Sequence, residues 1–273
     1  MNGLSPIRPQ ISFSFFKYTM LERKKKVVYC RNREGKSMQR VLDMDLDFFL
    51  ADCCPLAEKG HRPALAGHEP WAAEAVRSFL ERNCGLSRER PLPGRICLTH
   101  DGALGYWKEL MDRSELLAPF HVTHVDAHSD LGIGYPGPSY VLYNVLSLPP
   151  KRRLELDRFY RERKLDEANY LLFALAARIV SSLDNVRRPF SQNDVPSQLL
   201  TGDGAHIRLP QSFPDLFERV NGPEPLIPYH EYKTDGSFVA AVPYDFVSLA
   251  ISPRYAPEAA DELIPIFKEY MQS

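Results

Sequence analysis

The clearest alternation of apolar and polar residues lies near the start of the chain, between positions 42 and 47. Apolar side chains fall on one face of an extended segment there, and carboxylates fall on the other. The apolar set is Leu42, Met44 and Leu46, and the acidic set is Asp43, Asp45 and Asp47. The segment runs on into Phe48-Phe49-Leu50, which is typical of a protein interior. The pattern predicts an interior strand with three carboxylates on one face; a solvent-exposed edge strand is the alternative.

A second polar row follows the apolar residues of positions 116–122. On an extended strand, four ionisable side chains would project from one face. They are His124, Asp126, His128 and Asp130. Burying such a row without a partner is costly, and a bound metal ion removes that cost.

The rest of the chain alternates between helical and strand patterns. Helices are predicted at 71–83, after His100, and at 151–164, 165–183 and 257–271. Short strands are predicted at 95–99, 206–209 and 245–251, and loops at 184–205 and 224–235. This alternation predicts an α/β domain, in which ligands gather at the carboxyl ends of the strands.

Composition narrows the class of protein. The 273 residues fit one large domain or two small ones, and the net charge of −1 gives no drive toward nucleic acid or a membrane surface. The five cysteines are scattered and form no CxxC pair, which argues against a zinc ribbon or a disulfide framework and favours a cytoplasmic setting. No apolar run is long enough for a membrane span. Residues 1–38 are predicted to be an N-terminal extension, with Met20 a second candidate start, and 39–273 the domain.

Three predicted strand ends converge on one edge of the sheet. They bring His100, the acids of the first strand and the 126–130 set together, which gives six or seven oxygen and nitrogen ligands. That is too many for one tetrahedral zinc ion. It suits two divalent ions about 3.5–4 Å apart, and oxygen-rich coordination favours Mn²⁺. The chemistry implied is metal-assisted hydrolysis of an sp² carbon or a phosphoryl group.

These residues also resemble a known family. Asp126-Ala127-His128-Ser129-Asp130 is similar to the Asp-Ala-His-x-Asp signature of arginases, agmatinases and other ureohydrolases, but their Asp-x-Asp strand comes late in the chain. A divergent arginase-like family has an early Asp-Leu-Asp-Phe-Phe, a His before a Trp-containing helix, His-x-Asp-Ala-His-Ser-Asp, and a late Ser-Pro-x-Tyr-x-Pro. The matching segments are Asp45–Phe49, His100 with Trp107, His124–Asp130 and Ser252–Pro257. The resemblance spans roughly residues 40–257. This family includes peptide arginases, which convert arginine to ornithine in ribosomally made natural-product precursors.

The resemblance implies a three-layer α-β-α fold with a mostly parallel sheet, as in arginases and deacetylases, and two Mn²⁺ ions, for which Fe, Co or Ni can substitute. Asp126 and Asp45 would bridge the ions. His100 and Asp130 would hold one ion, and His128 and Asp47 the other. His124 would support the ligands by hydrogen bonding, and Asp43 would be either a ligand or a hydrogen-bond acceptor behind them. A metal-bound hydroxide would attack the guanidinium carbon, with Asp126 and Asp130 catalytic and Asp130 relaying a proton as urea leaves.

The expected substrate is an arginine-containing precursor peptide. The loop after the signature lacks most residues with which arginases bind the head group of free arginine, and a peptide-bound arginine has no such head group. The loop of this chain has Gly132, Ser139 and Asn144 instead, and Tyr143 lies near the position expected for the proton-shuttle histidine of arginases. Ser139 and Ser252 are predicted to contact the substrate. Glu231, Asp235 and Asp245 are the candidates for accepting the guanidinium group, and Glu231 is the preferred one.

Three alternatives remain open at this point. One is another C–N hydrolase, of agmatinase or deacylase type, acting on a small molecule. A second is a phosphatase that uses the Asp43-Met44-Asp45 segment, although this leaves positions 124–130 unexplained. The third is a metal-bound relative without enzymatic activity.

Overall fold

The structure is a computed structural model that describes residues 38–132, 137–188, 191, 193–210, 221–233 and 235–272. Apart from Met38, the predicted N-terminal extension lies outside these residues. No helix in the described part is both long and apolar enough to cross a membrane.

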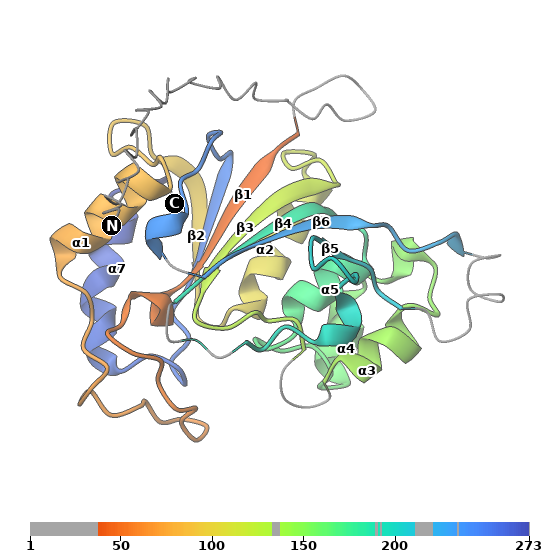
Figure 1. The fold of residues 1–273 in the computed structure, drawn as a ribbon, viewed down its shortest axis with the longest axis horizontal. Coiled ribbons are helices and arrows are strands. Elements are labelled where there is room, and N and C mark those ends of the chain that lie inside the picture. Colours follow the sequence, from red (N-terminus) through yellow and green to blue (C-terminus); the bar gives the residue numbers. More distant parts are fainter. Residues whose placement is uncertain are drawn as a thin grey trace, which may run out of the picture.

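A central sheet of eight strands organises the described residues (Figure 1). The strands are β1 (Arg40–Asp45), β2 (Leu92–Cys97), β3 (Phe120–Asp126), β4 (Val180–Arg187), β5 (His206–Ile207), β6 (Ile227–Tyr232), β7 (Phe246–Ala250) and β8 (Met271–Gln272). Their order is β5-β6-β4-β3-β1-β7-β2-β8, and all neighbours are parallel except β5 and β6.

Helices cover both faces of this sheet (Figure 1). One face carries α1 (Ala73–Ser78), which continues as a π-helical turn at Phe79–Asn83, and α7 (Ile264–Lys268), which follows a 3-10 helix at Glu258–Leu263. The other carries α2 (Asp101–Asp112) and α5 (Tyr170–Ala176), with α3 (Pro138–Tyr140), a π-helical turn (Val141–Val145) and α4 (Leu156–Arg161) beside them. The predicted three-layer α-β-α fold with a mostly parallel sheet is confirmed.

The two faces of β1 lead into different cores. Leu42 and Met44 pack into the cluster under α1 and α7, whereas Val41 joins the cluster under α2 and α5. Because side chains alternate along a strand, Asp43 and Asp45 point to the α2 and α5 side. The predicted interior strand is confirmed, and its acidic face lies inside the protein.

The connections of β1 and β3 leave the sheet on opposite faces. The chain runs from β1 through α1 to β2, but from β3 through α5 to β4, although β1 and β3 are neighbours. In open α/β sheets, ligands bind at the carboxyl ends of the strands where the connections diverge in this way.

Both acidic segments leave the strand conformation earlier than their alternation predicts. β1 ends at Asp45, and Leu46–Phe49 forms a 3-10 helix because the Asp45 carboxylate accepts a hydrogen bond from Asp47 N at 2.9 Å. β3 ends at Asp126, whose Oδ1 accepts a hydrogen bond from His128 N at 2.6 Å. Asp47 therefore lies on a 3-10 helix, and His128 and Asp130 follow β3 outside the strand, because local side-chain hydrogen bonds replace those of the sheet.

Other predicted elements were wrong or too long. The predicted helix 165–183 is helical only in α5, and its end belongs to β4; the predicted loop 224–235 contains β6. Val180 and Leu183 continue the three-to-four-residue apolar spacing of α5, so periodicity did not mark where the helix ends. The predicted helix 151–164 reduces to α4 with a 3-10 turn at Pro150–Arg152, while the strands at 206–209 and 245–251 are confirmed in shorter form.

Candidate metal centre

A cluster of carboxylates and imidazoles lies at the carboxyl ends of β1 and β3. Asp43 and Asp45 come from β1, Asp47 from the 3-10 helix after it, His100 from the start of α2, and His124 to Asp130 from the end of β3 and the turn that follows. The cluster has eight ionisable residues: Asp43, Asp45, Asp47, His100, His124, Asp126, His128 and Asp130. All except His128 are at most 6% exposed. The His128 side chain is 32% exposed, so it marks the side on which solvent reaches the cluster.

The first half of the cluster surrounds Nδ1 of His100. Oδ2 of Asp126 and Oδ2 of Asp130 each lie 2.9 Å from this nitrogen, and Oδ2 of Asp45 lies 3.2 Å away. None of these contacts has hydrogen-bond geometry. A buried nitrogen facing three carboxylates in this way is the arrangement expected around a cation.

The second half of the cluster surrounds Nδ1 of His128. Oδ2 of Asp47 lies 3.0 Å from it, and Oδ1 of Asp126 lies 3.5 Å from it. The two oxygens of Asp126 therefore face different halves, Oδ2 toward His100 and Oδ1 toward His128. Asp126 joins the two groups.

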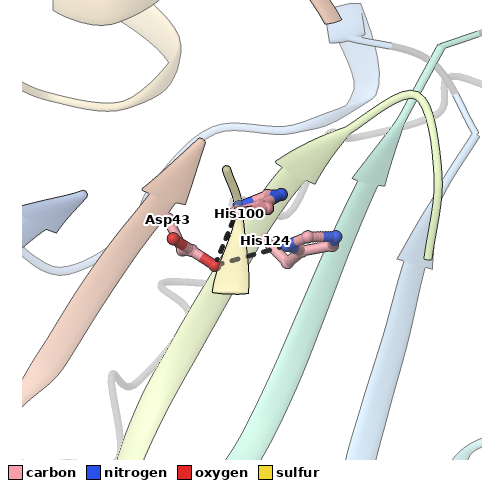
Figure 2. Close-up of side chains that lie close together, drawn as sticks. All are labelled: Asp43, His100 and His124. Atoms are coloured by element: carbon pink, nitrogen blue, oxygen red, sulfur yellow. Dashed lines mark ion pairs between the residues drawn. The ribbon is translucent and has the colours of Figure 1, made fainter. Parts of the chain in front are cut away.

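The groups behind the cluster fix the carboxylates of β1. Ser248 Oγ donates a hydrogen bond to Asp43 Oδ1 at 2.6 Å, and the Tyr170 hydroxyl donates one to Asp43 Oδ2. Ser252, whose φ is 47°, donates from its hydroxyl to Asp45 Oδ2. Asp43 Oδ2 also lies 3.3 Å from Nε2 of His100 (Figure 2). These bonds hold Asp43 and Asp45 in place before any ligand binds.

The turn after β3 is held from the other side. Asp194 accepts a hydrogen bond from Ser129 N at 2.8 Å, and Asp194 is itself bound by the Arg187 guanidinium. Arg187 ends β4 directly opposite Asp126 in the sheet register. The pairing of β3 with β4 thus positions the turn that presents His128 and Asp130.

The electrostatics of the cluster favour added positive charge. Burial, together with the neighbouring Asp45 and Asp126, raises the pKa of Asp47. Burial and Asp126 also raise the pKa of Asp130 to about 7. Burial opposes charge on His128, but Asp126 and Asp47 outweigh it and raise its pKa. The metal-free cluster therefore binds protons where a cation would otherwise sit.

Further shifts follow from the same contacts. Burial acts to raise the pKa of Asp43 and of Asp126, yet His100 beside both of them prevails and lowers each. For His100, burial acts to lower the pKa, but the carboxylates of Asp43, Asp126 and Asp130 prevail and raise it. His100 thus stabilises the charged forms of Asp43 and Asp126, whereas Asp47 and Asp130 are left with raised pKa values.

The donor set fits divalent metal ions. Four overlapping triads each have ligand atoms within 4.8 Å of one another. They are Asp43-His100-His124, Asp45-His100-Asp126, Asp47-Asp126-His128 and His124-Asp126-Asp130. All the donors are oxygen or imidazole nitrogen, a set typical of Mn, Fe, Co or Zn. These buried groups could hold metal ions. Six of the eight residues were expected to be ligands, whereas His124 was expected only to support the ligands and Asp43 to be either a ligand or a hydrogen-bond acceptor.

The predicted substrate residues are dispersed. Ser252 touches the cluster, whereas Ser139 is exposed on α3. Glu231 lies on β6, two strands from β3, with its Oε1 3.9 Å from Arg187 Nε, and it lines a cavity of about 160 Å³ with Arg188 and Lys233. Asp245 precedes β7 and accepts a hydrogen bond from Arg40 N, at the opposite end of the strands from the cluster. The side chain of Asp235 lies outside the described residues.

Sequence reasoning missed Tyr170, Ser248, Arg187 and Asp194. Each lies in a segment whose local pattern gives no sign of a site, and Tyr170 falls within an apolar helical run. A larger cavity, of about 660 Å³, lies beside the start of β2 and is lined by Arg95, Tyr106 and Lys268, far from these residues in the fold. We assign no chemistry to it.

No model of a known protein family matches this chain, and no curated protein matches it either. The site therefore has to be interpreted from its own geometry.

Proposed function

We propose that this protein is a two-metal hydrolase of the arginase-like family that converts arginine residues within a peptide to ornithine and releases urea. The observation that carries the proposal is the placement of Asp126. Its two oxygens face two separate histidine-containing groups, which is the arrangement of a carboxylate that bridges two ions. The order of the segments along the chain supports the same family.

Two divalent ions at such a site lower the pKa of water and polarise the group under attack. The protein contributes positioning and proton transfer. Water adds to the guanidinium carbon, the bond from that carbon to Nε breaks, and Nε gains a proton as urea leaves. Asp130 is the group proposed to relay a proton, because its Oδ2 belongs to the cluster and lies 2.9 Å from His100 Nδ1.

The surroundings of the cluster suit a substrate that inserts only a side chain. Only His128 among the cluster residues is substantially exposed, and its ring packs edge-on against Tyr255 with centroids 5.0 Å apart. Asn144 lies in the loop where arginases bind the head group of free arginine, and Tyr143 lies near the position of their proton-shuttle histidine; both are exposed at the surface. A peptide-bound arginine needs only its side chain to reach the ions, which suits a cluster exposed mainly at His128.

The guanidinium group needs an acceptor close to the ions. Glu231 is two strands from Asp126, about 10 Å at normal strand spacing, and already faces Arg187. Glu167 is the second candidate, since it follows α4 beside Gly132, whose N donates to Ala168 O at 3.0 Å. A guanidinium already binds Glu167, because Arg254 Nη1 lies 3.3 Å from its Oε1.

One observation favours a different C–N hydrolase. The cavity beside Glu231 is lined by three cationic side chains, from Arg187, Arg188 and Lys233. That surrounding suits a carboxylate better than a guanidinium, so a small amide or amidine that carries a carboxylate is the second candidate substrate.

The test starts from metal-free protein that is then loaded with Mn²⁺. The loaded protein is incubated with an arginine-containing peptide and, separately, with free arginine. We expect the peptide to lose about 42 Da, the difference between arginine and ornithine, with one urea formed per event. Glu167→Gln and Glu231→Gln form a matched pair, and the true acceptor is the one whose loss raises KM. Loss from free arginine alone would refute the peptide substrate. Hydrolysis of a carboxylate-bearing amide with neither arginine substrate consumed would favour the second candidate.

A further inference from the structure

Two imidazoles share one carboxylate behind the cluster (Figure 2). Asp43 Oδ2 lies 3.3 Å from Nε2 of His100 and 3.5 Å from Nδ1 of His124. The two rings are stacked, with centroids 5.1 Å apart and planes at 27°. A carboxylate beside the far nitrogen of an imidazole is the usual companion of a metal-ligating histidine, because it fixes the ring and its tautomer. Asp43 stands in this relation to both rings.

Tyr170 determines which nitrogen of His124 carries the proton. Its hydroxyl hydrogen is donated to Asp43, so its oxygen can only accept from Nδ1 of His124, 3.2 Å away. Nδ1 of a neutral His124 therefore carries the hydrogen, and Nε2 presents a lone pair.

That lone pair points into the cluster. His124 is fully buried, and its Nε2 has no hydrogen-bond partner. Oδ2 of Asp126 lies 3.5 Å from it, and both groups form a triad with Asp130. Two donors that share one ion at about 2.1 Å lie roughly 3.0–3.5 Å apart, which is the separation seen here. The lone pair of His124 Nε2 and those of the Asp126 carboxylate repel one another unless a cation lies between the two groups.

We infer that His124 is itself a metal ligand, binding through Nε2 to the ion held by His100, Asp126 and Asp130, rather than a residue that only supports the other ligands. This inference rests on the metal centre of the proposed function. It gives one ion two imidazoles and the other a single imidazole, from His128. Added nitrogen favours Fe²⁺ or Co²⁺ over Mn²⁺ at the first position.

Two substitutions separate the ligand role from a supporting role. His124→Asn keeps an amide nitrogen near the Nδ1 position, where it can still donate to Tyr170, but places nothing at Nε2. His124→Gln can extend an amide toward the Nε2 position and loses the Nδ1 contact. His121→Asn is the matched control, since His121 is also buried on β3 but points to the other face of the sheet.

The measurement is a Co²⁺ titration of each full-length, metal-free protein, followed by visible absorption and by metal analysis after dialysis. We expect two ions in the unsubstituted protein and in His121→Asn. His124→Asn should bind one of them at least tenfold more weakly with changed absorption bands, and His124→Gln should lie between. An unchanged affinity and spectrum in His124→Asn would overturn the inference.

A second measurement needs no substitution and so does not depend on the variants folding. Proton NMR of the Co²⁺-loaded protein shows exchangeable, strongly shifted signals from the ring N–H of each ligating imidazole. Three such signals are expected, from His100, His124 and His128; two would overturn the inference. If no ion binds at all, the metal centre fails and the proposed function fails with it. If two ions bind with three such signals but no peptide is hydrolysed, only the proposed reaction is refuted.

Discussion

His121 and His124 lie three residues apart on β3 and are both buried, yet their surroundings differ in kind. Nδ1 of His121 lies 2.7 Å from Ser182 Oγ, and its Nε2 lies 3.1 Å from both Thr123 Oγ1 and an oxygen of Asp184. Each of its nitrogens therefore has a partner within the protein. His124 has partners only at Nδ1.

The pKa values of the two histidines move in opposite directions. Burial lowers the pKa of His121, and Asp184, which is partly exposed, does not reverse this. Burial acts the same way on His124, but Asp43 and Asp126 outweigh it and raise the pKa. The protein completes the surroundings of His121 by itself, whereas those of His124 call for an added cation. A buried histidine can thus be assigned a structural or a ligand role from its partners rather than from its burial.

The strongest test of this contrast is Asp126→Asn. Removing one member of a buried charged group costs about 3–5 kcal/mol, a factor of roughly 10²–10⁴ in affinity. Both halves of the cluster should lose their ions, as measured by metal analysis after dialysis, and activity should disappear. His121→Asn should retain full metal content while melting at a lower temperature. The contrast would break if Asp126→Asn still bound two ions.

A second test uses pH. Burial and Asp126 raise the pKa of Asp130 to about 7, so a proton occupies this group in the metal-free protein below that pH. An ion must displace it, and metal affinity should rise about tenfold per pH unit for each proton displaced between pH 5 and 7. Mn²⁺ titrations at pH 5, 6 and 7 measure the slope.

The same group also affects stability. A carboxyl whose pKa is raised on folding stabilises the metal-free protein fully below its ordinary pKa, and this contribution is lost as the pH rises through about 7. Thermal melting of the metal-free protein should show that loss, and Asp130→Asn should flatten it. A metal affinity that did not change with pH would show that the cluster holds no displaceable protons.

The smallest expected effect on metal affinity comes from substituting a tyrosine. Tyr170 contacts His124, and Tyr244 serves as the matched tyrosine near His121. Tyr170→Phe keeps the ring beside His100, at a centroid distance of 4.7 Å, but removes the hydroxyl between Asp43 and His124. Groups in this position are worth about 10–100-fold in metal affinity. Tyr244→Phe removes an equally buried hydroxyl that binds Thr123 in the His121 network, and should leave metal binding unchanged. Equal losses of metal affinity in the two variants would contradict the assignment of Tyr170 to the site.

Local pattern in the sequence predicted the chemistry of the cluster well. The alternation at positions 42–47 placed acids on one interior face, and the spacing from Asp126 to Asp130 brought two more acids and an imidazole close together. These predictions succeeded because neighbours along the chain remain neighbours in any fold. Pattern failed at positions 180–183, which were expected to end a helix but begin β4, because Val180 and Leu183 continue the three-to-four-residue apolar spacing of α5.

The sequence by itself therefore determined the class of fold and the set of ligand atoms available. Only the tertiary structure decided how those atoms are held. Tyr170 and Ser248 reach Asp43 across 127 and 205 residues of chain, because the sheet places β1 between β3 and β7 and packs α5 over that face. Strand order depends on the packing of the whole chain, and no local period encodes it. Whether a histidine on β3 is satisfied by the protein or left facing carboxylates follows from that order.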